Sequence, residues 1–127
     1  MAETTVLPQR SLRWLTSLHS SYTVIMVTAT NREEAQKIAR HLLAKKLIAC
    51  ANIISPVSSL FYWSGKIEKA DEHLLLMKSR LDLFEELSES VKALHSYEVP
   101  EIIALPITRG ISNYIEWLDS SLKPANE

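Results

Sequence analysis

Four stretches of the chain are apolar at consecutive positions, at residues 24–27, 47–51, 74–77 and 102–105. Successive side chains of a β-strand point to opposite faces of the sheet, so these stretches place apolar groups on both faces. An antiparallel sheet that helices cover on one side only alternates apolar and polar residues instead. We therefore expect a sheet without a solvent-facing side. Its second face is predicted to be covered partly by a C-terminal helix and otherwise by other copies of the chain.

The predicted elements follow one another as β-α-β-β-α-β, with a short helix at the end. Apolar and β-branched residues predict strands near residues 22–30, 47–63, 66–79 and 100–106. Apolar residues three and four positions apart predict helices over residues 35–43, 84–94 and 111–122. This order is typical of a ferredoxin-like α+β domain, with an antiparallel sheet and two helices on one face.

Polar residues precede both long helices. Thr30 and Asn31 are each followed three residues later by a glutamate, which predicts a doubled capping box at the start of the first helix. Ser79 or Asp82 is predicted to cap the second helix.

The second and third strands are predicted to form a long hairpin that turns at Ser64 and Gly65. Each strand has roughly 14 residues, against a usual length of about 5–6, so the hairpin should project beyond the domain. Pro56 predicts a bulge or an edge position in the second strand. Near the tip lie three aromatic residues, Phe61, Tyr62 and Trp63, which we expect to pack against another subunit rather than their own domain.

The composition limits the domain organisation and the partners. The 127 residues suit one domain over residues 22–127, preceded by an extension over residues 1–21. In that extension, residues 11–18 permit a short amphipathic helix, but the extension is expected to be poorly ordered. The net charge of −1 gives no electrostatic reason to expect nucleic acid or an anionic membrane as partner. The sequence contains no secretory signal pattern or membrane-length apolar stretch, and its single cysteine suits a reducing cytoplasm.

Motifs for catalysis are missing from the sequence. It has no GxSxG or P-loop motif, and its two glycines do not suffice for a phosphate cradle, so we do not expect an enzyme. The four histidines form no metal-binding motif. His95 lies near Tyr97, Glu98 and Glu101 at a predicted helix-to-strand junction. Imidazole with carboxylates suits a divalent transition metal, and it suits a hydrogen-bonded corner equally well.

Several segments resemble the divalent-cation-tolerance (CutA) family. They cover residues 35–52 and the stretches SLFYWSGKIE, EHLLLMKS, HSYEVPEIIALPI and YIEWL. The resemblance implies a homotrimer of ferredoxin-like subunits, in which the hairpin extends into the neighbouring sheet. It also implies a cytoplasmic role in tolerance to divalent cations, copper especially, with no established reaction. The family is similar in architecture to PII-like signalling trimers.

The chain departs from the copper-ligand set proposed for some bacterial members. That set has a cysteine on the first strand and a double histidine, and the matching positions here are Val27 and Leu94, so only His95 remains. The first hypothesis is therefore weak binding of Cu²⁺ or another divalent cation through His95 with the carboxylates of Glu98 and Glu101.

Four residues match the family pattern, and the resemblance implies that they line a cleft between subunits: Lys66, Lys78, Tyr97 and Glu101. This leaves a second hypothesis open, a PII-like signalling or scaffold trimer that binds a small anionic ligand through Lys66 and Lys78. An acylphosphatase-like hydrolase is a distant third reading, since no phosphate loop is present.

Overall fold

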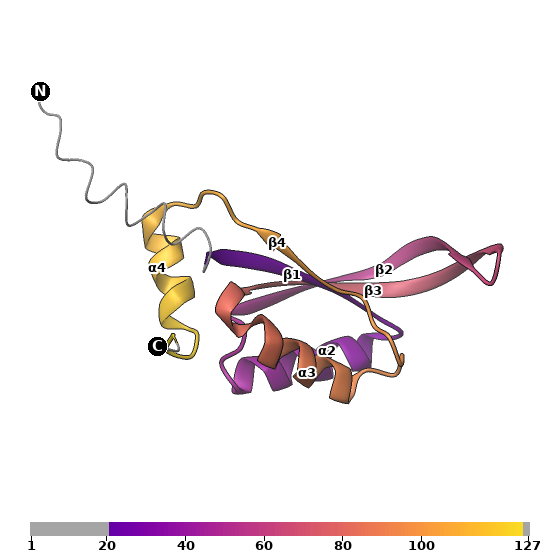
Figure 1. The fold of residues 1–127 in the computed structure, drawn as a ribbon, viewed down its shortest axis with the longest axis horizontal. Helices are drawn as coiled ribbons and strands as arrows, with labels where there is room; N and C mark the ends of the chain where they lie inside the picture. The colour runs from indigo at the N-terminus through magenta and orange to yellow at the C-terminus, as the bar shows by residue number, and fades with distance from the viewer. Residues whose placement is uncertain (1–20, 126–127) are drawn as a thin grey trace, which may run out of the picture.

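The computed structural model describes residues 21–125 as an α+β domain built on one four-stranded antiparallel sheet. In chain order the elements are β1 (Tyr22–Ala29), α2 (Arg32–Ala44), β2 (Cys50–Trp63), β3 (Lys66–Arg80), the 3₁₀ turn η1 (Leu81–Leu83), α3 (Phe84–Leu94), β4 (Ile102–Pro106) and α4 (Ser112–Ser120). The strand order is β2-β3-β1-β4. Helices α2 and α3 lie on one face of the sheet, and α4 lies at its end (Figure 1). The predicted extension and its possible helix lie outside the described residues, except for Ser21.

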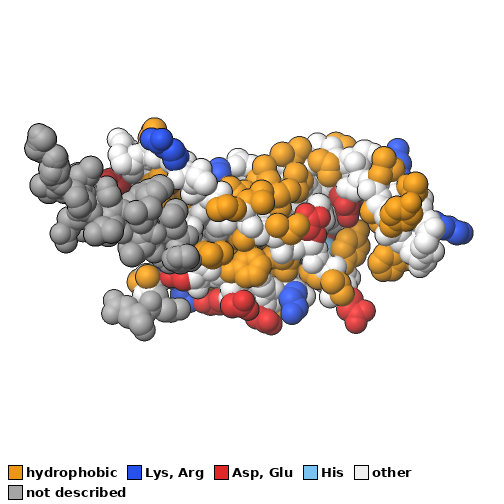
Figure 2. Space-filling view, turned by 45° about the horizontal axis from the view of Figure 1, so that its top comes forward, with side chains coloured by type: hydrophobic (Ala, Val, Ile, Leu, Met, Phe, Trp, Pro, Cys, Tyr) orange, Lys and Arg blue, Asp and Glu red, His pale blue; other side chains and the backbone are white. Residues whose placement is uncertain are grey.

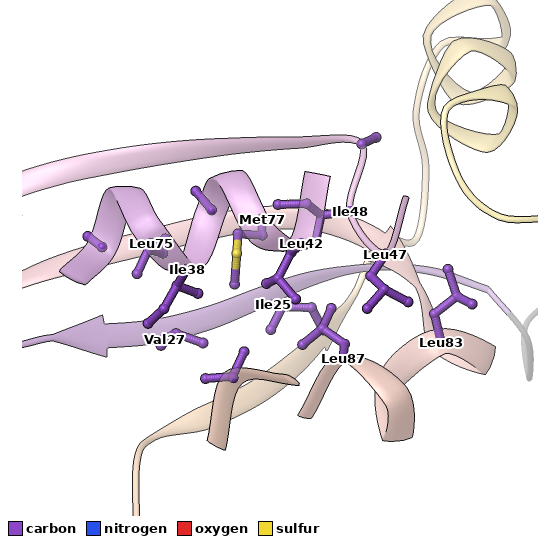
Figure 3. Close-up of a cluster of buried hydrophobic side chains, with 14 of the residues drawn as sticks. Ile25, Val27, Ile38, Leu42, Leu47, Ile48, Leu75, Met77, Leu83 and Leu87 are labelled. Atoms are coloured by element: carbon purple, nitrogen blue, oxygen red, sulfur yellow. The ribbon is translucent and has the colours of Figure 1, made fainter. Parts of the chain in front are cut away.

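The face toward α2 and α3 holds the core. The register pairs Ile25 with Met77 and Val27 with Leu75, which places these four side chains on the same face. All four are fully buried, and they pack with apolar residues of the two helices, such as Leu42 (Figure 3).

The opposite face is also apolar, as predicted, and much of it is open. Ile54, Ile103 and Leu105 are between 45% and 46% exposed, and Met26 and Leu76 pair between them at the centre. Figure 2 turns this side partly toward the viewer and shows hydrophobic side chains across the middle of the molecule. One chain therefore leaves a broad apolar surface on its sheet, which is unusual for a monomer.

Helix α4 covers only one end of this face. The hydroxyl of Tyr114 lies 3.8 Å from Cys50 Sγ, and the Lys78 ammonium lies 6.0 Å from the Tyr114 ring centre. Arg80 holds the helix in place, because its guanidinium donates to Asp119 Oδ1 at 2.9 Å and to the Lys123 carbonyl at 2.8 Å.

Strands β2 and β3 continue past the rest of the sheet as a two-stranded arm, residues 57–72 (Figure 1). The pairing of β1 with β3 ends at Ala29 and His73, so β3 has no second neighbour within residues 21–125 beyond that point. A register shift between Ile54 and Val57 confirms the bulge predicted at Pro56.

The helix caps agree with the sequence only at α2. Asn31 is the N-cap and accepts a hydrogen bond from the Glu34 amide at 2.7 Å. The other half of the predicted doubled box is wrong, because Thr30 is not the cap and its amide and hydroxyl donate to Glu34. The prediction that Ser79 or Asp82 caps the second long helix is wrong, because η1 intervenes and the α3 N-cap, Leu83, makes no side-chain bond. The Ser79 hydroxyl instead donates to the Leu47 carbonyl, and Asp82 accepts from Arg80.

Candidate functional site

The loop between α3 and β4, residues 95–101, brings together most of the predicted site residues. Its first residue, His95, has a fully buried side chain. A carbonyl oxygen only accepts, so Nε2 carries the ring proton and donates to the Thr28 carbonyl at 2.7 Å. Nδ1 accepts from the Tyr97 amide at 2.9 Å. Both ring nitrogens are therefore occupied, and His95 fastens the loop to the end of β1.

Glu34, in the first turn of α2, holds the same loop from the other side. Its Oε1 accepts from the amide and hydroxyl of Thr30, both at 2.8 Å, and its Oε2 accepts from the Ser96 amide at 2.6 Å. Burial by itself raises the pKa of Glu34, but the hydrogen bonds from Thr30 and Ser96 outweigh it and lower the pKa to about 2. The carboxylate is thus ionised throughout the physiological range.

Tyr97 connects the loop to the base of the arm. Its hydroxyl donates to Glu72 Oε2 at 3.0 Å, and Glu72 is buried on β3 where the arm begins. Burial and the hydrogen bond to Glu72 raise the pKa of the Tyr97 phenol. Tyr97 is therefore a neutral donor at neutral pH.

The prediction of a metal site at His95, Glu98 and Glu101 stays a prediction. Glu98 and Glu101 are exposed carboxylates, which are suitable ligands for a divalent cation. His95 would join them only after Nδ1 releases the Tyr97 amide. Within residues 21–125, no three His, Cys, Asp or Glu side chains are arranged to hold a metal ion. One described chain does not supply a complete ligand set.

The two lysines of the predicted cleft lie far apart in one chain. Lys66 pairs with Trp63 at the arm tip, and Lys78 pairs with Cys50 near α4. Twelve positions of β3 separate them, roughly 40 Å at the usual strand rise. Lys66, Lys78 and Tyr97 can share one cleft only if different copies of the chain contribute them.

The arm presents its aromatic residues to solvent. Tyr62 is 76% and Trp63 is 68% exposed, and Phe61 is 41% exposed. Because antiparallel partners share a face, Tyr62 lies with Leu60 and Ile67 on one face of the arm, and Phe61 and Trp63 lie on the other. Each face of the arm therefore carries exposed apolar side chains in a single chain, next to charged residues such as Lys69 and Glu68.

Two residues of this site, Glu72 and Ser96, received no role from the sequence, and Thr30 was predicted only as a helix cap. Glu34 was assigned only to a local helix cap, and its capping-box position gave the one available signal for its importance. Its second partner, Ser96, is 62 residues away and has no sequence signature.

The comparisons with known proteins identify the family of the chain. The sequence model of the family described as CutA1 divalent ion tolerance protein matches residues 23–121. The chain belongs to the CutA1 family. The family is named for tolerance to divalent ions and not for a catalysed reaction.

Two CutA relatives show how the chain compares in length. It is 46% identical over 99 residues to the divalent-cation tolerance protein CutA of Archaeoglobus fulgidus, which covers 78% of this chain and 96% of that protein. It is 46% identical over 100 residues to the chloroplastic protein CutA of Arabidopsis thaliana, covering 79% of this chain. The chain spans only 55% of the length of the Arabidopsis protein.

Solved CutA structures share the fold. The divalent cation tolerance protein of Thermus thermophilus superposes with a TM-score of 0.79 at 40% identity, over 80% of this chain and 99% of that one. CutA1 from Oryza sativa gives a TM-score of 0.80 at 40% identity, over 84% and 98% of the two chains.

Proposed function

We propose that this chain is a ferredoxin-like subunit of a homotrimer that acts in divalent-cation tolerance, copper tolerance above all, by binding the cation weakly. The observation that carries the proposal is the apolar surface that one chain leaves uncovered on its sheet and on its arm. Family membership supplies the connection to divalent cations.

The open face of the sheet supports assembly with copies of the same chain. Ile54, Ile103 and Leu105 extend the apolar surface toward both edges of the sheet, and α4 reaches only the end near Lys78. Burial of apolar area at about 25 cal/mol per Å² is the main favourable term in such an association.

The arm supports a ring rather than a two-fold dimer. A two-stranded ribbon is marginally stable alone, and this one exposes apolar side chains on both faces and is unpaired along both edges within residues 21–125. One flat partner surface covers one face of a ribbon, whereas an arm inserted between elements of the next copy is covered on both. Such head-to-tail contacts form a cyclic assembly when the rotation between neighbouring copies closes. The number three rests on the resemblance to the family.

The cation is proposed to bind at the loop after α3, through Glu98 and Glu101, with ligands from a second copy completing the site. His95 holds the loop, and it becomes a ligand only if Nδ1 exchanges the Tyr97 amide for the ion.

The assembly is tested by light scattering coupled to size-exclusion chromatography at micromolar concentration. The expected mass is three times the chain mass of 14.4 kDa. Trp63→Ser at the exposed arm tip should shift the mass toward one chain, while Lys69→Ser on the same arm should leave it unchanged. A wild-type chain that elutes as a stable monomer would refute the proposal.

Cation binding is tested by calorimetric titration with Cu²⁺. The double variant Glu98→Gln, Glu101→Gln should weaken binding, whereas Glu85→Gln, an equally exposed carboxylate on α3, should not. Electron paramagnetic resonance of the Cu²⁺-loaded protein then decides the role of His95, since nitrogen coupling reports an imidazole ligand. An isotherm that the double variant leaves unaltered would remove Glu98 and Glu101 from the site.

The proposed compartment is the cytoplasm, and the support is the composition of this chain. Its one cysteine, Cys50, is a free thiol, and no helix of the described part is long and apolar enough to cross a membrane. The names of relatives refer to other compartments, chloroplastic for the Arabidopsis protein and periplasmic for the Archaeoglobus fulgidus structure.

A second candidate is a PII-like trimer that binds a small anionic ligand in the cleft between subunits. The observation in its favour is Lys78, a half-buried cation on a largely apolar face, which donates to Asn52 Oδ1 at 3.1 Å. Thermal-shift measurements against a panel of anionic metabolites, with Lys78→Met as the negative control, test this candidate. No shift from any anion would count against it.

A further inference from the structure

Hydrogen bonds hold the first three residues of the loop after α3, whereas the middle of the loop is exposed to solvent. Three consecutive residues, His95, Ser96 and Tyr97, make hydrogen bonds to β1, to α2 and within the loop. Val99, two residues later, is 86% exposed. The geometry of the exposed part is therefore set by what holds residues 95–97.

Glu34 uses its two carboxylate oxygens for two different tasks. A capping-box glutamate normally serves its own helix start, and here Oε1 does so by accepting from the amide and hydroxyl of Thr30. Oε2 accepts from the Ser96 amide at 2.6 Å, a charge-assisted bond between segments 62 residues apart. The Thr30 and Ser96 hydroxyls also lie 3.3 Å from each other.

We propose that Glu34 is a positioning residue, a carboxylate clip that fixes the loop after α3 in the geometry that brings Tyr97 to Glu72. The inference rests on the proposed function in one respect, since the same loop carries Glu98 and Glu101. Because the clip orders the loop before any ligand arrives, a ligand at the loop meets a preorganised site.

The chemistry of the clip suggests two informative variants. Glu34→Asp keeps the charge and a residue suited to the first turn of a helix, but it is one methylene shorter and cannot serve Thr30 and Ser96 together. Glu34→Gln keeps the length of the side chain but has only one acceptor oxygen. Its NH₂ group would then face an N–H donor, Thr30 or Ser96, with which it cannot form a hydrogen bond. Glu86→Gln is the matched control, because Glu86 also lies in the first turn of a helix and accepts from an exposed lysine, Lys123, at 2.8 Å.

The main readout is hydrogen–deuterium exchange of the full chain, resolved at the amides of Ser96 and Tyr97. Both Glu34 variants should exchange at least about tenfold faster at Ser96, since each disturbs the carboxylate that accepts from this amide. The Tyr97 amide, which donates to His95 Nδ1, should also exchange faster because the loop around it loosens. The amides of β1 and β3 should keep their protection, and Glu86→Gln should match the wild type throughout. If Glu34→Asp folds with wild-type exchange at Ser96 and Tyr97, the clip does not exist.

Cation binding separates this inference from the proposed function. If the wild type binds Cu²⁺, the Glu34 variants should bind it about 10- to 100-fold more weakly, the usual effect of removing a group that orients a ligand. Unchanged affinity together with a loosened loop would overturn the link between the clip and the site. If the wild type binds no cation, the proposed function fails, and the exchange data alone still decide whether Glu34 positions the loop.

Discussion

The ionisation of Glu34 should make the stability of the protein depend on pH in a defined range. Burial by itself raises the pKa of Glu34, but the bonds from Thr30 and Ser96 lower it from its ordinary value of 4.5 to about 2. A carboxyl group whose pKa is lowered by folding stabilises the folded state at pH values above the pKa that the group has in the unfolded chain. This contribution is lost as the pH falls from about 4.5 through about 2.

The size of this contribution to the free energy of unfolding follows from the same difference in pKa. At about 1.4 kcal/mol per pKa unit, the shift from 4.5 to about 2 corresponds to about 3 kcal/mol. The carboxylate lies near the surface, so solvent screening reduces the figure, and we expect about 2 kcal/mol at neutral pH. Glu34→Gln removes the ionisation and should remove this pH dependence.

The assay is urea unfolding of the wild type and Glu34→Gln at pH 7, 5, 4, 3 and 2.5 and one protein concentration, because the assembly makes apparent stability concentration-dependent. The difference in unfolding free energy should be constant between pH 7 and 5 and should narrow steadily below about pH 4.5. Glu85→Gln, which removes an exposed carboxylate in the first turn of α3, serves as the control for a generic loss of negative charge. A gap between wild type and variant that keeps the same size from pH 7 to pH 2.5 would show that Glu34 is not held in its ionised form.

Four further changes test other parts of the structure by urea unfolding. Arg80→Met should destabilise by about 2 kcal/mol, since it removes a buried guanidinium that holds α4 through Asp119, and an unchanged midpoint would contradict this role. Lys46→Gly should stabilise by about 0.5–1 kcal/mol, because Lys46 ends α2 in the left-handed region with φ of 58°, and a loss of stability would refute the argument. Leu75→Ala, at a fully buried position, should cost about 3 kcal/mol, and a cost below about 1 kcal/mol would be inconsistent with a close-packed core. Tyr97→Phe should cost about 1–2 kcal/mol by leaving the buried Glu72 without its donor, and wild-type stability would show that the bond is dispensable.

The prediction of the fold from the sequence succeeded where local periodicity carried the information. The apolar stretches at both strand parities predicted two apolar faces, and the open face with Ile103 and Leu105 confirms this. Pro56 predicted the bulge, and Ser64 with Gly65 predicted the turn, because each residue type restricts its own backbone.

The cap of the second long helix could not be predicted, because two polar side chains near its start have partners elsewhere. The Ser79 hydroxyl donates to the Leu47 carbonyl, and Asp82 is held by Arg80. A capping motif indicates which residues are suited to the start of a helix. The same side chain can instead form its hydrogen bond with a group from another segment, and the motif does not show this.

The sequence by itself determined the order of the elements, the long hairpin and the surplus of apolar surface. Backbone geometry repeats every two residues in a strand and about every 3.6 in a helix, so the pattern of apolar residues records these features directly. The tertiary structure alone decided that both nitrogens of His95 are occupied, that Lys66 and Lys78 lie far apart, and that Glu34 reaches Ser96. Such contacts join segments that are distant along the chain. They depend on how helices and loops pack on the sheet, and the local pattern of residue types does not contain this information.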